Sequence, residues 1–302
     1  MLSLTDQAGN TITLHQLPER IISLVPSQTE LLFDLGLDEE VTGITKFCIH
    51  PNEWFKNKTR VGGTKTVNIQ KVADLKPDLI IANKEENVKE QIEELQKIAP
   101  VYVSDISNLE DALQMIKDVG QLVGKDEKAK YLVLEIETGF DELGTINAQY
   151  STLHAQADAV NLSTNQHTQL KTAFLIWKDP YMAAGGDTFI NDMMKRCGFK
   201  NIFENINRYP AITINQHPST VIPNLSSVNC QLSSPDSYRV NCQLLLLSSE
   251  PYPFKQKHIA ELQQHLPDTK IVLADGEMFS WYGSRLLQAP EYFKKLIALV
   301  QP

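Results

Sequence analysis

Two side chains in the first third of the chain have the types and spacing of a nucleophile and its base. Cys48 and His50 stand two residues apart, just before Pro51. An imidazole can take the proton of a nearby thiol, and catalysis then needs a third group that orients the base. On an extended loop, residues i and i+2 point the same way without orienting each other, and the sequence offers no third partner. His50 alone could instead provide an axial ligand to a metal, or form the turn before Pro51.

Other signatures of catalysis are weak. The sequence has no GxSxG elbow, no HExxH motif and no P-loop. Gly185-Gly186-Asp187-Thr188 could hold an anion at a helix N-terminus, although an ordinary helix cap is the simpler reading. None of the four cysteines forms a CxxC pair, which argues against a structural zinc site. We therefore predict a protein that is not an enzyme and has no intrinsic cofactor or metal.

Aromatic side chains gather where strands are predicted to end. The densest group is the stretch DGEMFSWYGSRLLQAP at 275–290, which contains one of only three tryptophans. Rings give a large, rigid contact area at low entropic cost, which suits a big flat ligand. A single ring after a strand is more often packing, but rings at successive strand ends would converge on one region. The recurring rings are Phe47, Trp177, Tyr181, Tyr252, Phe254, Phe279, Trp281 and Tyr282.

The elements that must position these rings alternate between strand and helix patterns. Short, nearly continuous apolar runs separated by helical patterns are typical of parallel strands that are covered on both faces. In such sheets, ligands bind beyond the carboxyl ends of the strands. The predicted strands lie at 20–25, 41–45, 78–82, 101–104, 173–177, 244–247 and 270–274. The predicted helices include 69–75, 86–98, 189–197, 257–266 and 290–300.

The middle of the chain has a different pattern. From 109 to 146, apolar residues recur at helical spacing and no strand is predicted. Twenty helical residues span roughly 30 Å, which is enough to cross between two domains. The polar segment 147–170 predicts a loop. We expect an N-terminal lobe at 1–110, a linking helical region at 111–148, and a C-terminal lobe at 149–302 with loop insertions at 149–170 and 215–242.

A pentapeptide occurs twice in the second of these insertions. Val-Asn-Cys-Gln-Leu stands at 228–232 and again at 240–244. A period of twelve residues is too short for a solenoid repeat. The sequence favours a local duplication that lengthens a loop, with coincidence in a Ser/Asn-rich stretch as the alternative.

The overall composition limits the location and the partners of the protein. With 302 residues the chain suits two domains, and a net charge of −9 argues against a nucleic-acid partner. No stretch of about 18 apolar residues is present, and the N-terminus lacks the pattern of a secretory signal. We expect a location in the periplasm or cell envelope if a leader was removed, and in the cytoplasm if the chain is complete as written.

Three segments resemble the substrate-binding proteins of ABC importers for cobalamin and iron–siderophores. They are RIISLVPSQTE at 20–30, VGGT at 61–64 and LKPDLI at 75–80. The resemblance covers roughly residues 8–145 and 171–300. The segments that resemble the cobalamin-binding branch most are 177–189, 248–254 and 275–285.

This resemblance implies an α/β fold with two Rossmann-like lobes, mainly parallel sheets, and one long linking helix that permits limited hinge motion. It also implies non-catalytic binding of a corrinoid, a cobalamin-like metal chelate, in a cleft between the lobes, by a monomer that serves ABC import. Phe279, Trp281 and Tyr282 would then lie against the corrin ring or its nucleotide tail, and Arg285 would pair with polar amides or phosphate. The predicted ligand-binding residues are Lys46, Phe47, His50, Gly63, Trp177, Tyr181, Tyr252, Phe254, Phe279, Trp281, Tyr282 and Arg285.

The chain departs from the family at two positions that contact the permease. The resemblance implies docking through an acidic residue on each lobe, which meets arginines of the membrane subunits. The corresponding positions here carry Gln70 and Gln216. Without both charges a paired electrostatic dock would be weaker. Together with the missing signal pattern, this raises the alternative of a protein that binds its ligand without feeding an ordinary periplasmic importer.

Three other readings remain open. The ligand could be a ferric siderophore or heme, although the loops offer few cations for an anionic siderophore, mainly Lys46, Lys178 and Arg285. The protein could be a cytoplasmic enzyme that modifies a chelate with Cys48 and His50. A degenerate pair of lobes used only for protein contacts would bind no small molecule.

Overall fold

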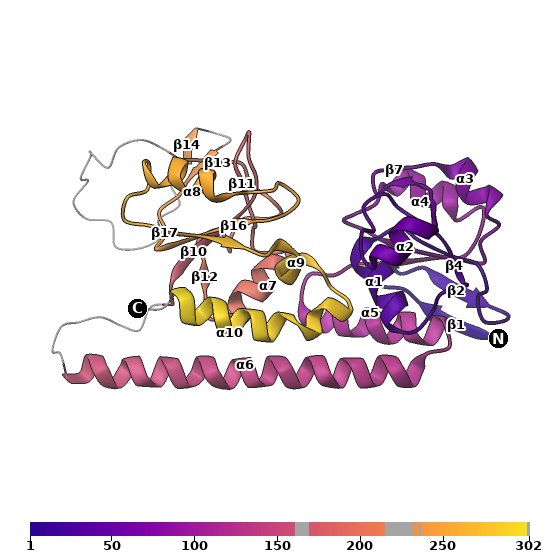
Figure 1. Ribbon diagram of the computed structural model, residues 1–302, viewed down its shortest axis with the longest axis horizontal. Helices are drawn as coiled ribbons and strands as arrows, with labels where there is room; N and C mark the ends of the chain where they lie inside the picture. The colour runs from indigo at the N-terminus through magenta and orange to yellow at the C-terminus, as the bar shows by residue number, and fades with distance from the viewer. Residues whose placement is uncertain (161–168, 215–231, 235–236, 301–302) are drawn as a thin grey trace. The chain divides into compact units, whose positions relative to one another are not determined.

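The computed structural model describes residues 1–160, 169–214, 232–234 and 237–300, which form two compact units (Figure 1). The N-terminal unit comprises Met1–Thr138 and Trp281–Leu287, and the C-terminal unit comprises Gly139–Ser280 and Gln288–Pro302. The chain therefore returns to the N-terminal unit for seven residues near its end. The sequence predicted one uninterrupted C-terminal lobe, whereas this division groups 281–287 with the N-terminal residues.

The N-terminal unit is built on a parallel sheet of order β5-β4-β3-β8-β9. Its strands are β3 (Ile21–Ser23), β4 (Val41–Ile44), β5 (Thr59–Arg60), β8 (Leu79–Asn83) and β9 (Val101–Ser104). Two antiparallel hairpins accompany it, β1 (Leu2–Thr5) with β2 (Thr11–Leu14), and β6 (Gly62–Gly63) with β7 (Thr66–Val67). The helices are α1 (Pro26–Asp34), α2 (Asn52–Asn57), α3 (Ile69–Asp74), α4 (Lys89–Leu95), α5 (Leu109–Leu122) and the 3₁₀ turn η1 (Ser284–Leu287).

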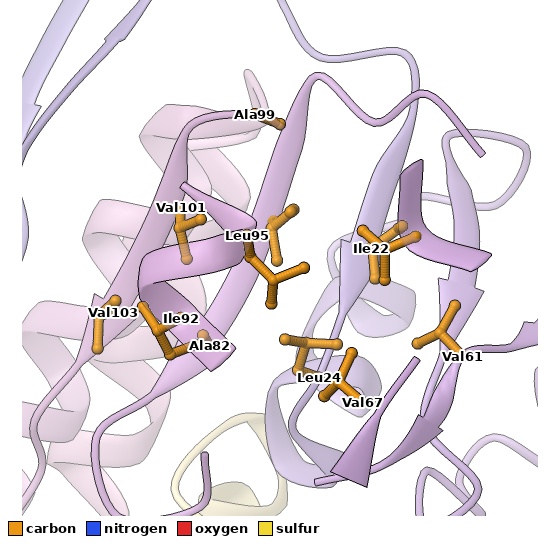
Figure 2. Close-up of a cluster of buried hydrophobic side chains, with 12 residues drawn as sticks. Ile22, Leu24, Val61, Val67, Ala82, Ile92, Leu95, Ala99, Val101 and Val103 are labelled. Carbon is orange, nitrogen blue, oxygen red and sulfur yellow. The ribbon is translucent and has the colours of Figure 1, made fainter. Parts of the chain in front are cut away.

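The apolar runs of the sequence become strands that are buried on both faces. Every residue of β3, β8 and β9 is buried. Because side chains alternate across a strand, Ile22 and Ile21 of β3 point to opposite faces, and both are fully buried. Figure 2 shows one of these faces, where Ile92 and Leu95 of α4 lie among the strand side chains. This double coverage confirms the predicted parallel α/β architecture.

The C-terminal unit repeats this plan. Its main sheet has the order β11-β10-β16-β17, and β12 also pairs with β10. The strands β10 (Lys171–Trp177), β12 (Lys200–Asn201), β16 (Leu244–Ser248) and β17 (Lys270–Ala274) are parallel, while β11 (Met182–Ala183) is antiparallel. In Figure 1, α8 (Gln256–Gln263) covers one side of the sheet, and α7 (Phe189–Arg196), α9 (Gly276–Ser280) and α10 (Ala289–Val300) cover the other. A small sheet contains β13 (Ile212–Thr213), β14 (Leu232–Ser234) and β15 (Ser237–Arg239).

The predicted linking region contains two helices, and one of them, the long helix α6, joins the two units as the resemblance implied. Helix α5 ends before Gly124, which adopts a left-handed conformation with φ +67°. Helix α6 (Asp126–Val160) then runs for 35 residues, about 52 Å at 1.5 Å per residue, and contains the boundary between the two units. The sequence predicted a loop from 147. This prediction was wrong as far as Val160, where the helix ends. The helical period was not recognised because the segment has few large apolar residues. The rest of that loop, 161–168, and most of the 215–242 insertion lie outside the described residues.

Within the part of the chain that the structure describes, no helix is long and apolar enough to cross a bilayer.

Two leucines allow a matched test of the packing. Leu95 is fully buried, whereas Leu134 on α6 is 59% exposed. Leu95→Ala should lower the free energy of unfolding by about 2–5 kcal/mol, because it removes buried methyl groups and leaves a cavity. Leu134→Ala should change it by less than about 0.5 kcal/mol. Urea denaturation followed by circular dichroism measures both, and equal effects would contradict the assigned core.

Candidate functional site

Each parallel sheet reverses its strand order at one point. In the N-terminal unit the chain builds outward from β3 through β4 to β5, then returns to the other side of β3 with β8 and β9. In the C-terminal unit β10 lies between β12, which precedes β16 in the chain, and β16 itself. At such a switch point the loops that leave neighbouring strands diverge, and ligands bind beyond the carboxyl ends. The candidate site of each unit is therefore the edge beyond β3 and β8, or beyond β10 and β16.

A buried polar network occupies the switch point of the N-terminal unit. Gln28, in the first turn of α1, donates from Nε2 to Ser104 Oγ at 2.6 Å, and Asn83 donates from Nδ2 to the same oxygen at 3.0 Å. All three side chains are at most 1% exposed. Gln28 Oε1 is buried and has no hydrogen-bond partner among the described residues. Sequence reasoning did not select these residues, although polar side chains at the ends of fully apolar strands were a usable signal.

The same network holds the loop that follows β8. Asn83 Oδ1 accepts hydrogen bonds from the backbone N–H groups of Glu85 and Glu86 at 2.8 and 3.0 Å. Asn87 Oδ1 accepts from the backbone N–H of Asn83, and its Nδ2 donates to the carbonyl oxygen of Thr64 in the β6–β7 hairpin. The hairpin and the β8 loop are thus fixed to each other by side chains and do not depend on a ligand for their shape.

Lys46 and Phe47 lie beside this hairpin and are exposed. The ammonium group of Lys46 lies 5.0 Å from the centre of the Phe47 ring, and the ring is 50% exposed. A Cβ atom on Gly63 would come within 3.2 Å of Phe47 Cε2 and 3.3 Å of Lys46 Cε. The structure therefore brings together three of the predicted ligand-binding residues, and glycine at 63 lets the other two pack against the hairpin.

Cys48 and His50 do not form a catalytic pair. The Cys48 thiol is fully buried and lies 3.1 Å from the hydroxyl groups of Thr29 and Thr45. Burial raises the pKa of this thiol, so the reactive thiolate is disfavoured. The His50 ring instead makes an edge contact with Trp281, with ring centres 5.5 Å apart. Both side chains therefore contribute to packing, and they do not act together as a nucleophile and a base.

Aromatic rings line the switch point of the C-terminal unit. Trp177 ends β10 and is 40% exposed, and its ring packs edge-on against Tyr252, which follows β16, at 5.8 Å. Tyr252 in turn packs against Phe254 at 4.7 Å. Phe254 is buried and contributes to the core of this unit. The exposed face of this group is thus Trp177 with the half-buried ring of Tyr252.

The lysine beside this aromatic group forms a salt bridge within the unit. Lys178 Nζ lies 2.6 Å from a carboxylate oxygen of Glu261 on α8, and the Tyr181 hydroxyl donates to the same carboxylate at 3.2 Å. The hydrogen bond from Lys178 and its charge lower the pKa of Glu261, so the carboxylate stays ionised. Tyr181 is therefore tied to a salt bridge, and Lys178 has its charge balanced by a neighbour.

His258 packs against the buried side of the aromatic group. It is buried, and its Nδ1 accepts a hydrogen bond from the backbone N–H of Lys255 at 2.8 Å at the start of α8. The ring also packs against Tyr252 and Phe254, with centres 5.6 and 5.5 Å away. Since Nδ1 must be unprotonated to accept, the neutral ring is the form that caps the helix.

The stretch 275–290 does not form one ligand-facing wall. Phe279 is fully buried in the C-terminal unit, between Phe174 of β10 and Phe293 of α10, with ring centres 4.8 Å from each. Because this ring is fully buried, it is not among the residues that we propose contact the ligand. The ring belongs to the packing between the sheet and the helices that cover it.

Trp281, Tyr282 and Arg285 also have roles that differ from the predicted ones. Both rings are buried in the segment that returns to the N-terminal unit. Arg285 donates from Nε and Nη2 to the two carboxylate oxygens of Glu30 at 3.0 and 2.6 Å, and its guanidinium lies 5.1 Å from the centre of the Trp281 ring. The arginine therefore pairs with the protein itself. Glu30 lies 255 residues earlier in the chain, so sequence spacing could not reveal the pair.

Two further sequence features have structural explanations. Thr188 Oγ1 accepts from the backbone N–H of Asn191 and caps α7, which confirms the simpler reading of the 185–188 stretch. Gln70 is exposed on α3 and donates to Asp74 Oδ1 at 2.8 Å. Gln216 lies outside the described residues. Among the residues that are described, no group of three or more His, Cys, Asp and Glu side chains could hold a metal ion.

The position of Phe279 predicts an effect on stability. Phe279→Ala should lower the free energy of unfolding by about 3–5 kcal/mol, because it empties the space between two other rings. Trp177→Ala should cost far less, since much of that ring is in water. Chemical denaturation of both variants measures the difference, and a stable Phe279→Ala protein would contradict the packing described.

His258 predicts a dependence of stability on pH. Burial lowers its pKa from the ordinary 6.5, and the nearby charges of Lys178, Lys257 and Lys255 act in the same direction, against Glu261. The unfolded chain then binds the proton more tightly than the folded chain, so stability is complete above pH 6.5 and falls as the pH drops below it.

The variant His258→Gln tests this dependence, because glutamine can cap the helix in the same way but does not titrate. The urea midpoint of the wild-type protein should fall between about pH 7 and pH 5.5, and the fall should be smaller in the variant. If the urea midpoint of the variant falls as far between these pH values as that of the wild type, other groups cause the pH dependence.

Comparison with protein families identifies the chain over most of its folded length. The family model for periplasmic binding proteins matches residues 21–221. This region includes most of the N-terminal unit, helix α6 and the first half of the C-terminal unit.

Curated relatives agree with this match. The chain is 28% identical over 207 residues to an uncharacterized ABC transporter substrate-binding lipoprotein of Bacillus subtilis (strain 168), which covers 66% of this chain and 60% of the relative. It is 24% identical over 200 residues to a vitamin B12-binding protein of Vibrio parahaemolyticus, which covers 66% of both chains. The matched region thus spans somewhat less than two thirds of the length of these relatives.

Solved structures with the same fold bind different chelates. The vitamin B12-binding protein of Vibrio cholerae superposes with a TM-score of 0.69 at 18% identity, covering 94% of this chain and 98% of the other. A periplasmic heme-binding protein from Roseiflexus sp. RS-1 has the same TM-score at 19% identity, covering 94% and 99%. A siderophore-binding protein solved with acinetobactin and ferric iron has a TM-score of 0.67 at 15% identity, covering 98% of each chain. At these identities the likeness establishes the fold and leaves the ligand open.

The parallel sheets, the long helix α6 and the family match over residues 21–221 lead to one conclusion. The chain is a member of the periplasmic binding protein family, a family of non-catalytic binding proteins.

Proposed function

We propose that this protein is the substrate-binding component of an ABC importer and that its ligand is a corrinoid, a cobalamin-like metal chelate. Family membership and the vitamin B12-binding proteins among the relatives support the general role. The chelate is cargo in this proposal and is not a resident cofactor.

The observation that carries the proposal is one exposed ring beyond the carboxyl ends of the strands in each unit. Phe47 lies beside the polar network of the N-terminal unit, and Trp177 lies at the end of β10 in the C-terminal unit. A ring at this edge offers a large, rigid contact area to a ligand. A wide, flat macrocycle gives each ring a surface to cover.

The charges near these rings favour a ligand with little net negative charge. Lys178 is paired with Glu261, and Arg285 is paired with Glu30. The loops offer three cations. The described contact of Lys46 is with a ring, whereas the other two cations each contact a carboxylate. A corrinoid rich in neutral amides needs fewer cationic partners than a highly anionic siderophore does.

A second candidate ligand is heme or a ferric siderophore, because solved structures of the same fold bind both. In that case His50 would be the nearest candidate for an axial ligand, and its ring would have to turn away from Trp281. Delivery to a permease and a location in the cell envelope complete the proposal, with Gln70 at the position where the family resemblance implies an acidic docking residue.

The test is a set of calorimetric titrations with cyanocobalamin, ferric enterobactin and hemin. Micromolar or tighter binding of cyanocobalamin, with much weaker binding of the other two, is the expected result. Phe47→Ala and Trp177→Ala should each weaken it about tenfold or more, since stacking of one ring contributes about 1–3 kcal/mol. Leu134→Ala, an exposed apolar residue on α6, is the matched control and should bind as the wild type.

Binding of hemin or ferric enterobactin in place of cyanocobalamin would keep the general role and overturn the corrinoid assignment. No heat with any of the three, in a protein whose denaturation curve is normal, would contradict the proposal as a whole.

A further inference from the structure

The chain changes unit twice near its C-terminus. It leaves the C-terminal unit after Ser280, lies on the N-terminal unit over Trp281–Leu287, and returns at Gln288. The chain therefore passes between the units three times, once within α6 and twice at the ends of this short segment. We call residues 281–287 the strap.

Both ends of the strap are fixed in the C-terminal unit. At its start, Ser280 Oγ donates to Glu250 Oε1 at 2.7 Å, and the backbone N–H of Gly276 donates to Ser249 Oγ at 2.9 Å. At its end, α10 begins, and the backbone N–H of Tyr292 donates to the carbonyl oxygen of Gln288 at 3.2 Å. The strap is thus a short span between two ordered helices and not a loose loop.

The middle of the strap lies directly on helix α1. A Cβ atom on Gly283 would come within 2.7 Å of the carbonyl oxygen of Ser27, so only glycine allows the two backbones to approach this closely. Ser284 is 3% exposed and Leu286 is fully buried. This contact covers the first turns of α1, the helix that supplies Gln28 to the polar network.

One ion pair fixes the strap to α1. Arg285 and Glu30 form a two-point interaction, and their side chains are only 11% and 14% exposed. Planar guanidinium–carboxylate pairs of this kind combine two charge-assisted hydrogen bonds with a defined orientation. Trp281 covers the guanidinium and is itself in contact with His50. Removing one partner would leave the other charge buried without its counter-charge, which is strongly unfavourable.

We propose that the strap is a latch of the N-terminal unit and that the Glu30–Arg285 pair is the clasp that keeps it closed on α1. The clasp determines how often the strap opens. This inference does not depend on which ligand the protein binds.

Trypsin provides a direct readout, because it cleaves after arginine and the clasp contains one. In the wild-type protein the bond between Arg285 and Leu286 should be cut slowly, since a protease needs the surrounding segment to open. Glu30→Gln keeps the size of the side chain and removes its charge. Cleavage after Arg285 should become about tenfold faster, because the open population rises when charge-assisted hydrogen bonds are lost. Mass spectrometry identifies the fragment that begins at Leu286.

Two further variants make the result specific. Arg285→Lys keeps a tryptic site but loses the two-point geometry, and it should also accelerate cleavage at position 285. Asp192→Asn removes a partner of Arg196 in a local ion pair on α7 and should leave cleavage at 285 unchanged. Wild-type rates at 285 in both clasp variants would overturn the proposal. So would a uniform rise in cleavage across both units, which would indicate global unfolding and not opening of the strap.

Discussion

Burial of both faces of each parallel sheet is the constraint on which the rest of the structure depends. Strands such as β3, β8 and β16 have no solvent-facing side, so helices must cover them above and below. Parallel pairing then places all carboxyl ends at one edge, and the reversal of strand order separates the loops that leave β3 and β8, and those that leave β10 and β16. The positions available to ligand-contacting side chains follow from these two facts before any particular residue is considered.

The two units use this edge in different ways. The N-terminal unit places amides and a hydroxyl there, held by Asn83 and Asn87 in a network that also fixes the β6–β7 hairpin. The C-terminal unit places rings there, supported by a neutral histidine at the start of α8. In both units the charges are largely balanced by neighbours, as with Lys178 and Glu261. The two carboxyl edges therefore differ in chemistry, with buried polar groups in one unit and rings in the other.

The sequence predicted the strands well because apolar runs bounded by polar residues leave few alternatives, and the α/β class followed from their alternation with helices. It failed where the outcome depends on contacts between distant residues. Phe279 and Trp281 are two residues apart, yet one enters the C-terminal core and the other contacts His50. Arg285 could not be assigned because its partner, Glu30, lies in the first helix. The end of α6 was missed since the sequence of its last turns contains few large apolar residues, and the amides at the strand ends were passed over in favour of rings.

The most direct test of the central claim is hydrogen–deuterium exchange of the whole protein with and without cyanocobalamin. The account predicts slower exchange in the loops beyond β4 and β8, at 45–50 and 83–88, and beyond β10 and β16, at 178–182 and 249–254. It also predicts no change in the outer strands β5 and β12. Protection confined to α6 or to the outer strands, with these four loops unaffected at saturating ligand, would contradict the account.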